Sequence, residues 1–154
     1  MSIKERIPIS ISENRLVLTG VIESNKLRIS HRVMEFIIDT GSPDSYISHR
    51  DVYKLQIPIN NYTADDEVDF GGSRFKSVKL PPFKFYLLKE DKTEEGTFEF
   101  EMNIRALKTT KTSIKKKEIA EALPSILGMD FLTQQKFSLH VIPTEKLAYL
   151  QYEG

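Results

Sequence analysis

The stretch that decides the fold is residues 33–43, which read VMEFIIDTGSP. Residues 33–38 are mostly apolar and form a run short enough for a strand buried in the interior. Asp, Gly, Ser and Pro follow closely at 39–43, and these residue types favour a turn. A turn at the end of a buried strand can hold polar side chains rigidly, and Asp39 is the titratable group placed there.

Strand patterns continue on both sides of this stretch. Isoleucines alternate with other residues over 7–11, aliphatic and β-branched residues fill 15–23, and a turn at 24–26 leads into a run over 27–38. Further strand patterns occupy 78–88, 96–107, 137–142 and 146–152, and a strand end with a short helix fits 46–55. Most of the expected elements are strands, so the sequence predicts a mainly β fold.

A hairpin is predicted at residues 68–75, VDFGGSRF. Its Gly71-Gly72 centre suits a two-residue turn, because both central residues of such a turn can require a positive φ. The polar residues that precede it, over 60–69, read as the approach to this hairpin. The glycine pair therefore marks the turn of a β-hairpin.

The last third of the chain changes character. Residues 108–123 are rich in charge and read as an exposed connector with a short helix, although the basic run in it could also contact an acidic partner. Ile126 and Leu127 then read as the end of a second buried strand. Gly128 reads as a point of close packing, and residues 129–135 as a short helix.

Composition limits the classes of function. The chain has 154 residues, which suits a single domain over residues 1–154, and 22 Lys+Arg against 22 Asp+Glu create no field that favours nucleic acid or a membrane. Cysteine is absent, and His31, His49 and His140 lack metal-ligand spacing, so we expect no metal and no cofactor. No signal-peptide core or membrane span is recognisable, and we expect a cytoplasmic protein.

Three elements together resemble the retropepsin family of homodimeric aspartic peptidases. They are FIIDTG over residues 36–41, the glycine hairpin, and ILG over 126–128 leading into a helix. Their order and separation match that family over a core of about residues 16–150. The resemblance implies a closed or partly open acid-protease β-barrel with a flap hairpin and one or two short helices.

The resemblance also implies roles for individual residues. Asp39 would be the catalytic carboxylate, Thr40 would brace the loop by a hydrogen bond across the dimer axis, and Gly41 would let the substrate backbone approach. The flap would close over substrate and exclude water. Its residues would be Phe70, Gly71, Gly72 and Ser73, and the residues supporting the site would be Ile126, Leu127 and Gly128.

The positions after Gly41 depart from the family pattern. Many viral members carry two acids that hold the substrate backbone where this chain has Pro43 and Asp44. Pro43 has no N–H to donate, so at least one of those contacts must differ. We expect Ser42 and Asp44 in the substrate cleft, although Asp44 could equally bond the backbone of its own turn.

Peptide hydrolysis by carboxylates needs two of them close together, one to take a proton from water and one to donate a proton. One chain has a single Asp-Thr-Gly, so a two-fold homodimer would supply the pair. Strands from the chain ends, above all residues 146–152, are expected in its interface. We therefore predict an aspartic endopeptidase acting on extended, largely apolar peptides. The alternative is a non-catalytic retropepsin-like module for dimerisation or peptide binding.

Overall fold

The structure is a computed structural model that describes residues 5–70, 72–90, 96–109 and 114–154. Gly71 of the expected flap therefore lies outside the described residues. The elements are, in order, β1 (Arg6–Ser12), β2 (Arg15–Ser24), β3 (Ile29–Ile38), β4 (Tyr46–Ile47), α1 (His49–Lys54), the 3-10 turn η1 (Ile59–Asn61), β5 (Asp66–Phe70), β6 (Ser73–Lys79), β7 (Phe83–Leu88), β8 (Thr97–Met102), β9 (Arg105–Lys108), α2 (Ile114–Ala122), β10 (Ile126–Leu127), α3 (Met129–Gln134), β11 (Phe137–Ile142), the 3-10 turn η2 (Pro143–Glu145) and β12 (Leu147–Tyr152).

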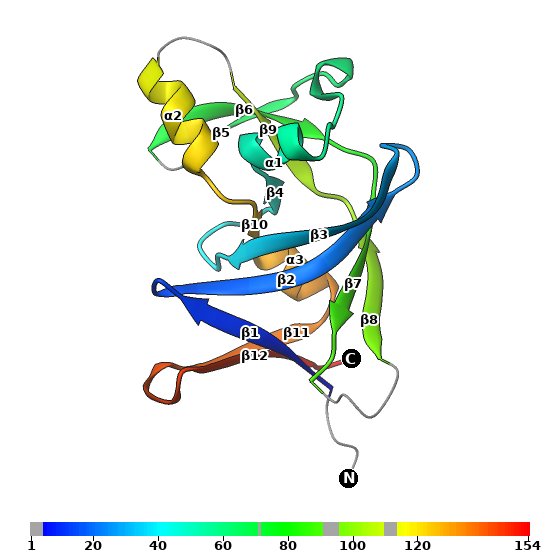
Figure 1. The fold of residues 1–154 in the computed structure, drawn as a ribbon, viewed down its shortest axis with the longest axis vertical. Coiled ribbons are helices and arrows are strands. Elements are labelled where there is room, and N and C mark those ends of the chain that lie inside the picture. The colour runs from blue at the N-terminus through cyan, green and yellow to red at the C-terminus, as the bar shows by residue number, and fades with distance from the viewer. Residues whose placement is uncertain (1–4, 71, 91–95, 110–113) are drawn as a thin grey trace.

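The strands form one strongly bent sheet (Figure 1). Its main path runs β11-β12-β1-β2-β3-β10-β4-β9-β6-β5, and β7 and β8 branch from β2. The path ends at β11 on one side and β5 on the other, so the sheet does not close on itself. The predicted mainly β fold with a few short helices is therefore confirmed, in the partly open form. No helix in the described part of the chain has the length and apolar character needed to cross a membrane.

The main core lies inside the bend of this sheet. Strand β2 alternates as a half-buried strand should, with Leu18 and Ile22 fully buried and Thr19 exposed between them. Aromatic side chains fill the space between β7, β8 and α3: Phe85 stacks on Phe100 at 4.9 Å between ring centroids, and Phe100 meets Phe131 at 5.6 Å. These aromatic contacts hold α3 against β7 and β8.

A second, smaller core lies under the β5–β6 hairpin. Tyr46, Phe75, Leu107, Ala120 and Ile126 are all buried in it. The segment expected as an exposed connector contributes to this core, because α2 is helical and its Ala120 is fully buried. Lys117, Glu118 and Glu121 of the same helix remain exposed, so the segment covers part of this core with Ala120 and is not only a connector.

The base of the β5–β6 hairpin is fastened to β9 by Arg105. The Arg105 guanidinium donates to the Ser77 hydroxyl on β6 at 2.5 Å and to the carboxylate of Asp65, which precedes β5. Asp65 N–H also donates to the Ser77 carbonyl at 3.1 Å. Phe70 pairs with Ser73 at the other end, so the turn has two residues as predicted, and Gly72 has a φ of +80°. The hairpin is thus anchored at its base and projects at its tip.

The titration of Asp65 tests this anchor. Burial acts to raise the pKa of Asp65, but the hydrogen bond and charge of Arg105, with the charge of Lys79, outweigh it and lower the pKa below the ordinary 3.8. The pair therefore adds stability above the ordinary pKa and loses it as the pH falls through the folded-state value. In NMR titrations of the side-chain carboxyl, we expect Arg105→Gln to move the pKa of Asp65 upward.

The matched control is Arg74→Gln. Arg74 pairs with Glu67 at 2.8 Å in the same hairpin and does not contact Asp65, so its loss should leave the Asp65 titration unchanged. An Asp65 pKa at or above 3.8 in the parent protein would contradict the proposed anchor.

Candidate active site

Asp39 stands at the end of β3, in a tight turn on the surface of the chain. Its N–H donates to the Leu127 carbonyl at 3.0 Å, which extends the pairing of β3 with β10 by one residue. Its carboxylate accepts from Gly41 N–H at 2.9 Å, and its carbonyl accepts from Ser42 N–H at 3.1 Å. One backbone N–H therefore orients the exposed carboxylate, and two further hydrogen bonds fix the backbone of Asp39.

Gly128 sets the position of this loop from behind. A Cβ atom at residue 128 would lie 2.4 Å from the Ser42 carbonyl oxygen and 2.5 Å from that of Asp44. The residues after Gly128 bond the same loop: Met129 N–H donates to the Ser42 carbonyl at 2.8 Å, and Asp130 N–H donates to the Pro43 carbonyl at 3.0 Å. Only a residue without a side chain permits this approach of two backbones.

Ser45 and Asp130 form a second bridge that the sequence analysis did not predict. The fully buried Ser45 donates through its hydroxyl to one Asp130 oxygen at 2.6 Å and through its N–H to the other at 3.1 Å. The same hydroxyl accepts from Gly128 N–H at 2.9 Å. The only local signal was an acid in the first turn of a predicted helix, and its partner lies 85 residues away.

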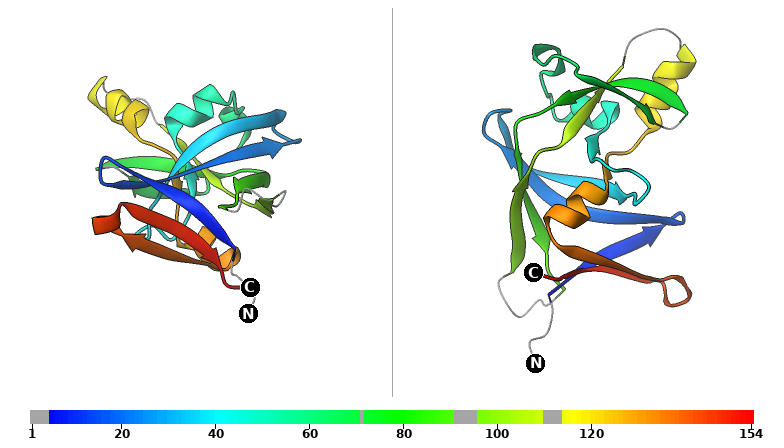
Figure 2. Two further views of the ribbon diagram at one scale, coloured as in Figure 1. Left: turned by 60° about the horizontal axis from the view of Figure 1, so that its bottom comes forward. Right: turned by 180° about the vertical axis from the view of Figure 1, so that it is seen from behind.

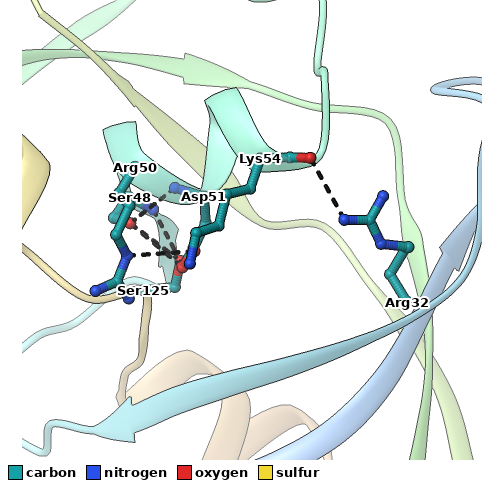
Figure 3. Close-up of polar contacts among 6 residues, drawn as sticks. All are labelled: Arg32, Ser48, Arg50, Asp51, Lys54 and Ser125. Carbon is teal, nitrogen blue, oxygen red and sulfur yellow. Dashed lines mark hydrogen bonds and ion pairs between the residues drawn. The ribbon is translucent and has the colours of Figure 1, made fainter.

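A buried polar network lies on the other side of β10 and joins it to α1 (Figure 3). Asp51 is buried and accepts from the Ser125 hydroxyl at 2.6 Å and from the Ser48 hydroxyl at 3.3 Å. Arg50 lies beside the carboxylate at 3.5 Å. The Ser125 carbonyl accepts from Ile37 N–H at 2.9 Å, so the network also holds the strand that leads to Asp39.

A cleft of about 440 Å³ opens between the Asp39 loop and the β5–β6 hairpin. Asp39, Gly41, Ser42 and Pro43 line it from the loop. Its apolar walls come from Ile37, Tyr46, Val68, Phe70, Leu123 and Ile126. The cleft thus brings the predicted catalytic residue and the predicted flap residue Phe70 to one space, with Ile126 at its wall.

The other predicted site residues lie around this cleft. Thr40 is exposed beside Asp39, Ser73 pairs with Phe70 in the hairpin, and Leu127 is fully buried behind the loop. Asp44 is not among the residues that line the cleft, and its carbonyl accepts from the Ser42 hydroxyl at 2.7 Å. The negative charge of Asp44 acts on the nearby Tyr46. The pKa of Tyr46 is raised mainly by burial and next by the charge of Asp44.

Two charged residues of the cleft were missed by the sequence analysis. Arg15, at the start of β2, and Asp69, in β5, both line it. Neither position carries a local signal, because charged residues at strand ends and on hairpins are common on any β protein surface. Within the described residues, no group of three or more His, Asp or Glu side chains is placed to hold a metal ion.

We expect Gly128→Ala to displace the Asp39 loop. The added Cβ meets two backbone carbonyl oxygens that cannot move aside as a flexible side chain could, so the free energy of unfolding should fall by about 1–3 kcal/mol. Amide exchange at Asp39 and Gly41 should accelerate as well. The matched control is Met129→Ala, which truncates an exposed side chain at the next position and should change stability by less than about 0.5 kcal/mol. Equal melting and exchange in both variants would remove Gly128 from this role.

Comparisons with known proteins concern the fold. No protein-family model matches the chain, and no curated protein sequence matches it. Its structure is similar to a solved structure described as a retropepsin-like aspartic protease from Rickettsia conorii, with a TM-score of 0.54 and 14% sequence identity. The match covers 99% of this chain and 96% of that one. The chain therefore has the retropepsin-like fold over nearly its whole length.

Proposed function

We propose that this chain is one protomer of an aspartic endopeptidase whose catalytic carboxylates are two copies of Asp39. The observation that carries the proposal is the placement of Asp39: its carboxylate is exposed, oriented by Gly41 N–H, and borders a cleft that the β5–β6 hairpin overhangs. The retropepsin-like fold supports the same reading. Fold alone does not establish activity, so the proposal rests on the site.

A single chain supplies one of the two carboxylates that the reaction requires. In the proposed dimer, one ionised Asp39 takes a proton from a water molecule, whose oxygen then attacks the scissile carbonyl carbon. The other Asp39, protonated at the start, donates its proton to the carbonyl oxygen. Collapse of the tetrahedral intermediate breaks the C–N bond, and the leaving nitrogen receives a proton from the carboxyl group that took one from water. One hydroxyl of the intermediate returns its proton to the other Asp39 as the new carboxyl group forms. The pair again holds one shared proton after each cycle.

The cleft indicates the class of substrate. Its walls are largely apolar, so burial of an apolar side chain between Ile37, Phe70 and Ile126 would favour binding. The β5–β6 ribbon lies across the cleft from Asp39 and would cover an extended peptide. These features favour cleavage within extended, largely apolar segments.

The primary test is Asp39→Asn in purified protein, assayed on a mixture of unstructured peptides. The change removes the titrating group and preserves the shape of the side chain, so hydrolysis should fall by at least about 10²–10⁴-fold while the melting temperature stays close to that of the parent. The control is Glu35→Gln, an exposed carboxylate on β3 that lies outside the cleft. Full activity in Asp39→Asn would refute the assignment.

A pair of Asp39 carboxylates that share one proton also predicts the form of the pH profile. Activity requires one protonated and one ionised carboxylate, so the rate should pass through a maximum, at about pH 4 to 6, and fall on both sides. A pepstatin-like transition-state mimic should inhibit across the same range. A rate that is flat from pH 4 to 8, or that depends on added Zn²⁺, would count against two carboxylates. Tight binding of the mimic without any hydrolysis would favour the non-catalytic peptide-binding module.

A further inference from the structure

We propose that Arg15 is a specificity-determining residue of the cleft, and that its guanidinium binds a carboxylate of the substrate. The preferred substrates would then be extended apolar segments that carry an acidic side chain close to the scissile bond. The inference rests on the proposed function, because it names the substrate class of that same cleft. Three features of Arg15 support it: its place in the sheet, the availability of its guanidinium and the other side chains of the cleft.

The strand register places Arg15 beside Asp39. Strands β2 and β3 are antiparallel, and Val17 lies opposite Ile37. The same register carried two residues further puts Arg15 opposite Asp39, and alternate residues of a strand share one face of the sheet. Arg15, Ile37 and Asp39 all line the cleft, as this arrangement requires. Opposite residues have Cβ atoms about 5 Å apart, so the Arg15 side chain can reach a substrate chain held at Asp39.

A tight turn fixes the backbone of Arg15. Arg15 is the first residue of β2 and pairs with Ser12, the last residue of β1. The two residues between them, Glu13 and Asn14, have φ values of 51° and 60°, and a two-residue hairpin turn of type I′ needs positive φ at both positions. Figure 1 from the front and Figure 2 from behind show this turn beside the loop that follows β3. The turn therefore holds Arg15 next to the site.

The Arg15 guanidinium has no acidic partner among the described residues. Arg15 is exposed, and it takes part in none of the ion pairs that the described part of the chain forms. By contrast, Arg74 and Arg105, which hold the β5–β6 hairpin, are each bonded to an acid. A guanidinium stays charged at any working pH, and its planar fork of N–H donors matches a carboxylate. Arg15 is therefore available to an acidic group of a ligand.

Two carboxylates of the cleft restrict where an acidic side chain of the substrate can lie. Asp39 shares the face of Arg15, and Asp69 lines the cleft from β5. Both repel a substrate carboxylate, whereas Arg15 attracts one, so an acid is favoured only at a position that meets Arg15. The remaining walls are largely apolar and select apolar neighbours. In a two-fold dimer each chain contributes one Arg15, so such a position would exist on both sides of the scissile bond.

Cleavage of paired peptides tests the contact. The probes are unstructured peptides with an apolar centre, in which a single Glu or Gln is moved along the positions on either side. At about pH 6, where a Glu side chain is ionised, the best Glu peptide should be cut with a kcat/KM about five- to tenfold above that of its Gln counterpart. Arg15→Gln should remove this difference. Arg15→Lys should retain part of it, because Lys keeps the charge but not the planar fork.

Two controls separate this contact from a general effect of charge. Arg32→Gln removes an exposed arginine from the other end of the β2–β3 ladder, outside the cleft, and should leave the preference for Glu unchanged. The second control is the pH profile. Recognition of a substrate carboxylate affects the Glu peptide alone, and its advantage should disappear as the pH falls below about 4, where Glu is protonated. If Arg15 acted instead on the Asp39 pair, Arg15→Gln would shift the profiles of both peptides equally, and the inference would fail.

Peptide binding to Asp39→Asn protein makes the result independent of hydrolysis. Fluorescence anisotropy with the same labelled peptides should show the Glu peptide bound about five- to tenfold more tightly than the Gln peptide. Adding Arg15→Gln to the Asp39→Asn protein should make the two dissociation constants equal, whereas adding Arg32→Gln should not.

Two results would overturn the role of Arg15: equal cleavage and binding of the Glu and Gln peptides at every position, or a preference for Glu that survives Arg15→Gln. Failure of the peptidase proposal looks different. A protein that binds the Glu peptide through Arg15 but cuts no peptide would keep this contact and refute the catalytic assignment. A protein that cuts the Glu and Gln peptides equally, and loses activity in Asp39→Asn, would keep the catalytic assignment and refute this contact.

Discussion

The structure depends on the close approach of Gly128 to the loop that follows β3. The backbone of residue 128 occupies the space where a side chain would touch the Ser42 and Asp44 carbonyl oxygens. This approach lets the first amides of α3 bond the loop and lets β10 run parallel beside β3 up to Asp39. The orientation of the Asp39 carboxylate is therefore a consequence of tertiary packing as well as of its own turn.

Local signals in the sequence were sufficient for most of the fold. The alternation in β2 and the apolar run before Asp39 specify strands because one residue in two must face the core. The Gly71-Gly72 pair predicts the two-residue turn, and Phe70 pairs with Ser73 as that turn requires. The partly open sheet, by contrast, follows from which strand edges meet, and a strand pattern does not say which edges those are.

The parts of the site that were missed are held by contacts between distant residues. Ser45 and Asp130 meet across 85 positions, and Asp51 and Ser125 across 74. Buried polar pairs of this kind leave no periodic pattern, because each needs only one residue at each end. Helix α2 was missed as a cover for a similar reason: its charges dominate its composition, while the buried Ala120 that packs into the second core is small.

The exposure of Asp39 in the single chain bears on how the proposed enzyme would be controlled. Water around an exposed carboxylate weakens its electrostatic effect, whereas a closed and desolvated site strengthens it. Pairing of two chains in the proposed dimer would bring a second Asp39 and exclude part of that water at the same time. A second copy would therefore complete the pair of carboxylates and strengthen its electrostatic effect in one step, so activity should follow the fraction of paired chains.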